Sequence, residues 1–452
     1  MKTAKDAIQL SKPDNRLSPK RLLTTILLCS GLAISGQANG LTLEQAIAIA
    51  QQNDPWIEGS RLRQSALASQ RISAGTLPDP MVSAGFANLP TDTFDFDQEA
   101  MTQFKVGISQ AIPRGDSRTL RQQQLGSLEA QHPLHRADRR ARVATNVSVA
   151  WLNAWRAQES IRLIEEDRDL FEQLVDVAQS NYASALGKTR QQDLIRAQLE
   201  LTRLDDRLVQ LSESMETALY ALSQWLQVNA ISTSVSGQLP ELVVSAGQGL
   251  HPDNPASQQV IARKLSQHPA ILAVDLELEA RRTGVALAEQ RYKPEWRLNA
   301  SYGYREDDPM GPKRADFFSL GVSFDLPLFT SKRQDQQVQS AAASTEAVIT
   351  ERVLLLRKMV ADFSTQQARL RRLEQRKALY ESRLLEEMRD QAAASLTAYT
   401  NDDGDFAEVV RAKIAELNAR IDALNIRVDR QITLARLNYF LAQADTSAET
   451  SS

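Results

Sequence analysis

The chain has 452 residues, of which 24% are charged and 6% aromatic, and its formal net charge at pH 7 is −3. This length can hold two or three ordinary domains, and the mild charge indicates no nucleic-acid partner. No apolar run approaches the roughly 20 residues that a transmembrane helix needs, which argues against membrane helices.

Residues 1–40 resemble a secretory signal peptide. Six basic and two acidic residues occupy the first 21 positions, an apolar segment spans 22–35, and Ala38 and Gly40 offer small side chains for cleavage. The only cysteine, Cys29, follows Leu28, where a lipoprotein signal has a small residue. We therefore interpret Cys29 as part of the apolar segment rather than as a lipid anchor. The mature chain then has neither a disulfide nor a thiolate metal site.

The next part of the chain, 41–228, predicts helices and a strand pair. Residues 41–53 are amphipathic with Thr42 as N-cap, and Asp54-Pro55 opens a second helix to about 74. Alternating side chains predict strands at about 81–89 and 103–112. A helix from about 117 to 184, on the order of 100 Å long, is expected to kink at Pro133. A return helix from about 191 to 227 has apolar residues at steps of three and four, as in coiled coils.

The same pattern occurs a second time after a Ser-, Gly- and Pro-rich linker at 229–257. Four landmarks recur 214 residues later, which indicates an internal duplication; they are Pro55, Gly107, Ser109 and Pro113, matched by Pro269, Gly321, Ser323 and Pro327. The second repeat, 258–443, predicts strands at about 295–304 and 316–326, a helix over 333–398 and a return helix. Residues 444–452 predict a disordered tail.

Each long helix is separated from its return helix by a glycine. Gly187 and Gly404 are the isolated helix breakers in two otherwise proline-free stretches. Each repeat therefore predicts a long helical hairpin with its tip at one of these glycines.

The four predicted strands are apolar on one face and polar or small on the other, as outer-membrane strands are. Four strands are too few to close a barrel, and a bilayer tolerates no open sheet edge. Several chains would then have to pool their strands. The alternative is a soluble four-stranded sheet.

Several segments resemble the TolC-like outer-membrane efflux proteins. The resemblance is carried by LTLEQAIAIAQQNDP, GISQAIP, GVSFDLPLF, YASALGKTRQQDLIRAQLEL and YTNDDGDFAEVVRAKIAEL. It implies an α+β membrane protein, a homotrimer whose helical hairpins form a periplasmic α-barrel below a shared twelve-stranded β-barrel in outer-membrane lipid. Such proteins are exit ducts that work with a periplasmic adaptor protein and an inner-membrane efflux pump. The segment LPDPMVSAGFANLP is most similar to the branch serving heavy-metal pumps of the resistance–nodulation–division type.

No catalytic constellation is present, so we predict no enzymatic activity and no cofactor. His132 and His135 flank Pro133, which suggests a solvated kink rather than a metal site. Met81 and Met101 are possible soft metal ligands, but we interpret them as packing residues. We predict no metal site, and we expect His268 to begin a helix as Asp54 does.

The hairpin tips carry the candidate functional residues. Asp193 and Glu408 each stand four residues before an alanine, a spacing that resembles the family's tip motif. In a trimer, Glu408 with Asp402, Asp403 and Asp405 would form a ring of carboxylates that favours cations. A solvated polar turn is the open alternative.

Two arginines complicate a simple acidic gate. Arg411 stands where the resemblance implies an aspartate nearer the pore, and Arg196 occupies the matching place in the first repeat. We expect the two arginines to pair with Glu408 and Asp193 and so hold the tips closed. The resemblance also implies docking of the adaptor at the tips, through Tyr182, Leu186, Gly187, Tyr399 and Gly404. The rival function is a non-transporting periplasmic coiled-coil scaffold.

Overall fold

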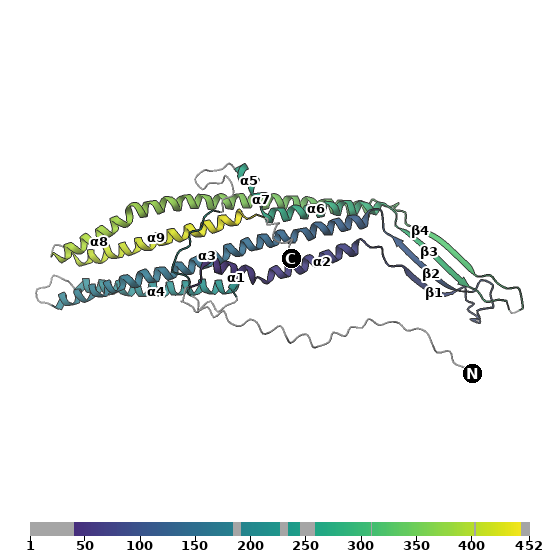
Figure 1. The fold of residues 1–452 in the computed structure, drawn as a ribbon, viewed down its shortest axis with the longest axis horizontal. Coiled ribbons are helices and arrows are strands. Elements are labelled where there is room, and N and C mark those ends of the chain that lie inside the picture. Colours follow the sequence, from purple (N-terminus) through teal and green to yellow (C-terminus); the bar gives the residue numbers. More distant parts are fainter. Residues whose placement is uncertain are drawn as a thin grey trace, which may run out of the picture. The chain divides into compact units, whose positions relative to one another are not determined.

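The computed structural model describes residues 40–183, 191–226, 234–244, 258–308, 310–401 and 404–443 (Figure 1). The expected signal peptide with Cys29, the tip residues Leu186, Gly187, Asp402 and Asp403, and the tail after residue 443 lie outside the described residues.

The first repeat contains two short helices, two strands and a helical hairpin. Its elements are α1 (Leu43–Gln52), α2 (Pro55–Ala74), β1 (Met81–Ala87), β2 (Gln103–Ile112), α3 (Ser117–Ala183) and α4 (Gln191–Leu226). Thr42 caps α1 in a capping box with Gln45. Asp54 caps α2 through the backbone N–H of Trp56 at 3.0 Å, and Arg139 of α3 donates to the same carboxylate at 2.7 Å.

The second repeat has the same order. Its elements are α5 (Gln258–Leu265), α6 (Pro269–Glu289), the 3₁₀ turn η2 (Gln290–Tyr292), β3 (Trp296–Tyr304), β4 (Phe317–Phe324), α7 (Gln334–Leu379), η3 (Tyr380–Leu384), α8 (Leu385–Thr400) and α9 (Phe406–Phe440). His268 caps α6, because its Nδ1 accepts from the N–H of Ala270 at 3.2 Å. The expectation that His268 begins a helix is therefore confirmed.

Both long helices are continuous. The helix expected over 333–398 is present and contains the π-helical turn η3, where the i→i+5 pattern changes the direction in which later side chains point. α3 continues through Pro133, and the kink expected there stays a prediction. The helix is supported there by packing against α2 and α6, which offsets the missing proline N–H.

The helices lie side by side in a layer. α3 contacts α4 and α9 in one half of its length and α2 and α6 in the other, and α7 packs against α6 and α9. Arg156 of α3 and Arg369 of α7 both pair with Asp429 of α9, at 2.7 and 3.1 Å. α9 is therefore fixed to both long helices. Among the helices of the described ranges, none combines the length and apolarity needed to cross a bilayer.

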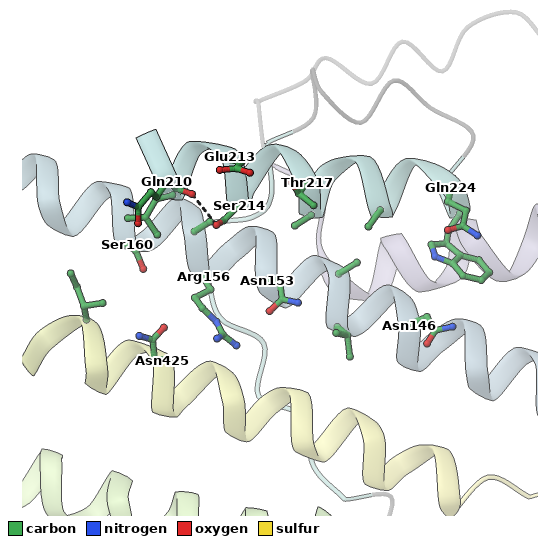
Figure 2. Close-up of a pocket in the computed structure, with 18 of the residues that line it drawn as sticks. Asn146, Asn153, Arg156, Ser160, Gln210, Glu213, Ser214, Thr217, Gln224 and Asn425 are labelled. Atoms are coloured by element: carbon green, nitrogen blue, oxygen red, sulfur yellow. Dashed lines mark hydrogen bonds between the residues drawn. The ribbon is translucent and has the colours of Figure 1, made fainter. Parts of the chain in front are cut away.

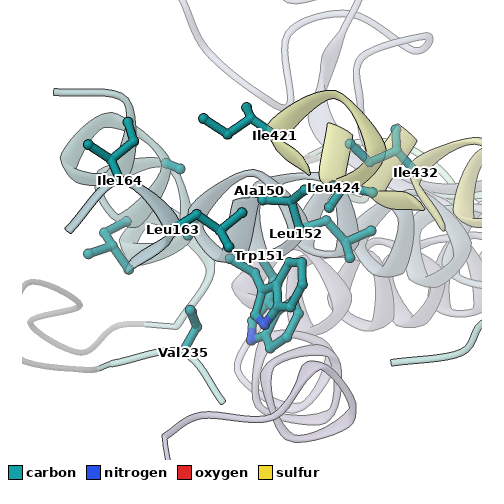
Figure 3. Packing of buried hydrophobic residues seen from close by; sticks show 14 of the residues in the cluster. Ala150, Trp151, Leu152, Leu163, Ile164, Val235, Ile421, Leu424 and Ile432 are labelled. Carbon is teal, nitrogen blue, oxygen red and sulfur yellow. The ribbon is translucent and has the colours of Figure 1, made fainter. Parts of the chain in front are cut away.

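A segment that we call the strap, residues 234–244, crosses the helix layer. Val235 forms a parallel bridge with Leu41, and Leu41 O accepts the indole N–H of the fully buried Trp151 at 2.8 Å. Further along, the backbone N–H of Leu242 donates to Gln431 of α9 at 2.9 Å. Figure 3 shows Trp151 pointing to the side of α3 where Val235 lies. The strap therefore ties the start of the fold to both repeats.

The strands form one antiparallel sheet in the order β1-β2-β3-β4. β2 pairs with β3 over nine positions, from Phe104 opposite Tyr304 to Ile112 opposite Trp296. The two repeats are thus joined within one sheet, and within the described residues β1 and β4 each keep one unpaired edge.

Candidate functional site

The register assigns nearly all large apolar side chains to one face of the sheet. Directly opposed residues in an antiparallel pair lie on the same face, so pairs such as Val106 with Tyr302 and Ala300 with Leu320 extend one surface across the strands. The apolar face comprises Val82, Ala84 and Phe86 of β1; Phe104, Val106, Ile108 and Ile112 of β2, with the polar Gln110 between them; Trp296, Leu298, Ala300, Tyr302 and Tyr304 of β3; and Phe318, Leu320, Val322 and Phe324 of β4.

The opposite face is mostly small or polar, and its large apolar residues, Met81 and Phe317, each stand at the start of a strand. Ser83, Gly107, Ser301 and Ser319 form one row across all four strands. Glycine is useful there, since a Cβ on Gly107 would come within 3.0 Å of Ser83 Oγ. The expected division into an apolar and a polar face is confirmed for the residues of the four strands.

The apolar face is open in the single chain. Phe318 is 72% exposed, Leu320 76% and Val322 56%. A soluble monomer rarely exposes a contiguous apolar patch of this kind. Aromatic rings lie at both ends of the strands: Trp296 stacks near Phe324 with centroids 4.6 Å apart, and Phe86 lies 5.2 Å from Phe104. Aromatic girdles at two levels are typical of strands that cross a membrane.

The helix layer has a polar groove between α3, α4 and α9. Its volume is about 1090 Å³. Figure 2 shows small polar side chains along it, from Asn153 on α3, Ser214 and Thr217 on α4, and Asn425 on α9. On α3 the groove residues Asn153 and Arg156 lie about 140–160° around the helix from Trp151 and Gln158, which donate to Leu41 and to Val235 of the strap. The groove and the strap therefore occupy opposite faces of the layer.

The described tip residues have distinct surroundings. Asp193 is buried at the start of α4, whereas Arg196, Glu408 and Arg411 are exposed. Asp405 caps α9 by accepting from the N–H of Ala407 at 3.2 Å, a structural role that the sequence did not reveal. Within the described residues no ion pair joins Glu408 to Arg411 in one chain.

The second tip also shows why it carries a glycine. A Cβ on Gly404 would lie 2.6 Å from the backbone nitrogen of Tyr399, so only a residue without a side chain fits this close approach. The ring of Tyr399 packs edge-on against Phe406, with centroids 5.6 Å apart. The side chain of Tyr182, at the first tip, lies outside the described residues. The gate and docking roles of the tip residues remain predictions.

The histidines are more enclosed than the sequence suggested. His132 and His135 are half-buried, with ring centroids 6.2 Å apart, and His132 Nδ1 lies 3.1 Å from Ser60 Oγ. Burial is the main cause that lowers the pKa of both. Both rings keep part of their surface exposed, and Ser60 of α2 lies beside His132. In the described part of the chain, no group of three or more His, Cys, Asp or Glu side chains is placed to hold a metal ion.

A partly buried polar network that sequence reasoning missed joins α3, α6 and α9. The hydroxyl of Tyr439 donates to Asp138 at 2.9 Å, and Arg142 pairs with the same carboxylate at 2.8 Å. His268 Nε2 lies 3.0 Å from the carbonyl oxygen of Tyr439. Burial is the main cause that raises the pKa of Tyr439 to about 12 and lowers the pKa of His268. These residues are far apart in sequence and carry no shared motif.

Comparison with known proteins identifies the fold. No family model and no curated protein sequence matches the chain. Among solved structures, it is similar to the outer membrane protein VceC of Vibrio cholerae, at 16% identity over 89% of this chain and 97% of that one, with a TM-score of 0.71. The CmeC outer membrane channel of Campylobacter jejuni matches at 15% identity over 88% and 85%, with a TM-score of 0.70. The open state of the MtrE outer membrane channel of Neisseria gonorrhoeae matches at 16% identity over 89% of each chain, with a TM-score of 0.69. At such identities the likeness establishes a shared fold.

Proposed function

We propose that this chain is a TolC-like exit duct of the outer membrane, in which three copies pool their strands into one twelve-stranded barrel. The observation that carries the proposal is the sheet itself, which has an exposed apolar face and, within the described residues, two unpaired edges. In a bilayer each unpaired backbone group costs several kcal/mol. Three copies that pair β1 of one chain with β4 of the next would remove every open edge.

The polar surfaces support a passage through such an assembly. The small and polar face of the sheet, with Ser83, Gly107, Ser301 and Ser319 in one row, would line the barrel. The polar groove of the helix layer would continue that path in the periplasm, with the strap on the outer side. This arrangement needs no catalytic group, because transport through a duct is diffusion along a wetted channel.

The proposal also includes partner proteins, a transported substrate and the residues at the aperture. A periplasmic adaptor protein would dock at the hairpin tips, and an inner-membrane pump would supply the substrate. Metal cations are a candidate cargo on the resemblance of LPDPMVSAGFANLP to the heavy-metal branch. At the aperture we propose that Asp193, Arg196, Glu408 and Arg411 act between neighbouring copies, because the described residues of one chain do not pair Glu408 with Arg411.

The location of the protein tests the duct. Expression of the full chain followed by membrane fractionation is expected to give an outer-membrane trimer that dissociates on heating in detergent. A soluble periplasmic monomer would contradict the proposal and favour the coiled-coil scaffold.

The aperture is tested by single-channel conductance in planar bilayers. Glu408→Ala together with Arg411→Ala is expected to change conductance and cation preference, because it removes the first acidic and the first basic side chain of α9. Glu346→Ala, at an exposed position on α7, is the matched control. Unchanged conductance in the double variant would rule out the gate but not the duct.

A further inference from the structure

The two surfaces assigned to the transport path carry more basic than acidic side chains, although the whole chain has a formal net charge of −3. The charged residues that line the groove are Arg156, Arg207, Arg436 and Glu213. Within the bounds of the four strands the only charged side chains are Lys105 of β2 and Arg297 of β3. Both lie on the small and polar face of the sheet. An acidic protein therefore places basic residues where a solute would pass.

Two of the three arginines in the groove lack an acidic partner. Arg156 is neutralised by its pair with Asp429 at 2.7 Å. Arg207 donates to the neutral Oδ1 of Asn418 at 2.6 Å. Arg207 and Arg436 are half-buried, and within the described residues neither forms an ion pair. Partial burial reduces the screening of a charge by water and salt, so both arginines act on a solute in the groove.

On the polar face of the sheet, Lys105 is a charge without a nearby counter-charge. It lies opposite Gly85 and Gly303. Its side chain is exposed, and within the described residues it forms no ion pair. Opposed residues share a face, so no side chain covers Lys105 across its row. Its diagonal neighbours within the strands are uncharged; they are Ser83, Ala87 and Ser301.

Arg297, by contrast, lies at the helix end of the sheet, where the charges cancel. It borders a small cavity together with Arg114, Glu295 and Asp325. Arg114 pairs with Asp325, and its Nε lies 3.9 Å from Glu295. Two basic and two acidic side chains meet there, so this level of the path is neutral.

We propose that the path selects anions, so that the cargo of the duct carries a carboxylate, a phosphate or another anionic group. The charges left unbalanced are three basic residues against one acidic residue, a net +2 per chain: Lys105, Arg207 and Arg436 against Glu213. A passage lined by one sign of charge concentrates solutes of the opposite sign, and rings of Lys or Arg select anions in pores. The inference rests on the proposed duct and names its substrate class, which argues against free metal cations.

The carboxylates at the loop end of the sheet act in the opposite direction. The segment 88–102 contains four acidic residues, and Asp316 and Glu306 accept from the hydroxyls of Tyr302 and Tyr304. At physiological salt the Debye length is about 8 Å, so each charge acts mainly at its own level. If the field of these carboxylates dominated the path, cations would be favoured. The two interpretations therefore predict opposite results at the wall.

Single introduced thiols can report the local potential on each surface. Cys29 is the only cysteine of the chain, so the experiments start from a Cys29→Ala background. Ser301→Cys places a thiol on the polar face, diagonal to Lys105 and roughly 7–8 Å from it. The assay compares the rates at which an anionic and a cationic methanethiosulfonate, the sulfonatoethyl and trimethylammonioethyl reagents, modify the purified full chain in detergent. The ratio of the two rates is divided by the ratio measured on mercaptoethanol, which removes the intrinsic reactivity of the reagents.

Asn146→Cys is the matching probe in the groove (Figure 2). It lies near Arg436, because the hydroxyl of the neighbouring Thr145 donates to the carbonyl oxygen of Ala435 at 3.3 Å. Asn146 is exposed, so the reagents can reach a thiol at this position.

In about 0.01 M salt we expect both thiols to favour the anionic reagent. Lys105→Gln should lower the ratio at the sheet probe about threefold, and Arg436→Gln should do the same at the groove probe, which is the effect of one charge roughly 8 Å away in water. Both effects should disappear in about 1 M salt, where the Debye length is about 3 Å. Arg263→Gln removes an exposed basic residue of α5, outside both surfaces, and should change neither ratio.

A preference for the cationic reagent at the two probes would overturn the proposal, as would ratios that do not respond to Lys105→Gln and Arg436→Gln. The readout is thiol chemistry rather than conductance, so this failure would leave the outer-membrane trimer test of the duct unaffected. Absence of the trimer would instead remove the duct and the proposed anion selection together.

Discussion

The substitution Leu320→Arg distinguishes a strand whose apolar face meets lipid from one whose apolar face meets water. Leu320 lies in the middle of β4 on the apolar face, opposite Ala300, and is 76% exposed in the single chain. If that face meets water, a surface substitution changes stability by no more than about 0.5 kcal/mol. If it meets lipid near the bilayer centre, arginine costs about 2–4 kcal/mol. Three copies in one barrel would raise this to about 6–12 kcal/mol per assembly.

The neighbouring residue supplies the matched control. Ser319→Arg places the same side chain one position away on the polar face, where we expect a change within about 0.5 kcal/mol. The measurement is reversible urea unfolding of the purified protein in lipid vesicles, together with the yield of each variant in the outer-membrane fraction. Equal effects of the two substitutions would refute the assignment of the apolar face to lipid.

Three further predictions concern the helical part. Gly404→Ala should destabilise the second tip by about 1–3 kcal/mol, because its Cβ would meet the backbone of Tyr399, and limited proteolysis should cut faster between α8 and α9. Tyr439→Phe should cost about 1.5–3 kcal/mol in chemical unfolding, since it removes a hydrogen bond to the Asp138 carboxylate. Stability should fall as the pH drops below about 6.5, because burial lowers the pKa of His268 in the folded chain. The unfolded chain then binds a proton at His268 more readily than the folded chain. The contribution of neutral His268 to folding stability is therefore present above that pH and lost below it.

Each of these predictions has a control. A Cβ added to Gly237 would meet no described atom within 4 Å, so Gly237→Ala should leave proteolysis unchanged, and similar cutting in both glycine variants would contradict the close-approach argument. A Tyr439→Phe protein as stable as the original would mean that water replaces the lost partner. His268→Asn keeps a good N-cap without a titrating group. The free energy of unfolding of this variant should fall less on acidification than that of the original protein. An unchanged pH dependence would mean that other groups cause the loss.

Much of the fold follows from local sequence pattern. Proline and glycine mark the helix ends. Because Pro55 and Pro269 are 214 residues apart, an element assigned in one repeat is expected at the matching position of the other. Alternation of side chains in β3 and β4 was enough to assign the two sheet faces, because a strand has a strict period of two. These signals are local, so they can be read from the sequence without knowledge of tertiary contacts.

The features that could not be predicted depend on long-range contacts. Tyr439 and Asp138 are 301 positions apart, and no residue type in either segment signals their hydrogen bond. The π-helical turn at Tyr380–Leu384 leaves no proline or glycine as a marker. The burial of Gln334, which is 7% exposed, likewise depends on the packing of segments that are distant in sequence.

The bridge between Leu41 and Val235 sets an order of events during folding. A polypeptide that emerges from its N-terminus first presents residues 41–52 long before residue 235 exists to receive them. α1 packs on α3 and α4, and the backbone of Leu41 pairs with Ser234 and Ser236. The contacts of the first helix to be made are thus completed only after the strap has been made. Slow exchange of the Leu41 amide, which donates to Ser234, would then report that the strap has docked.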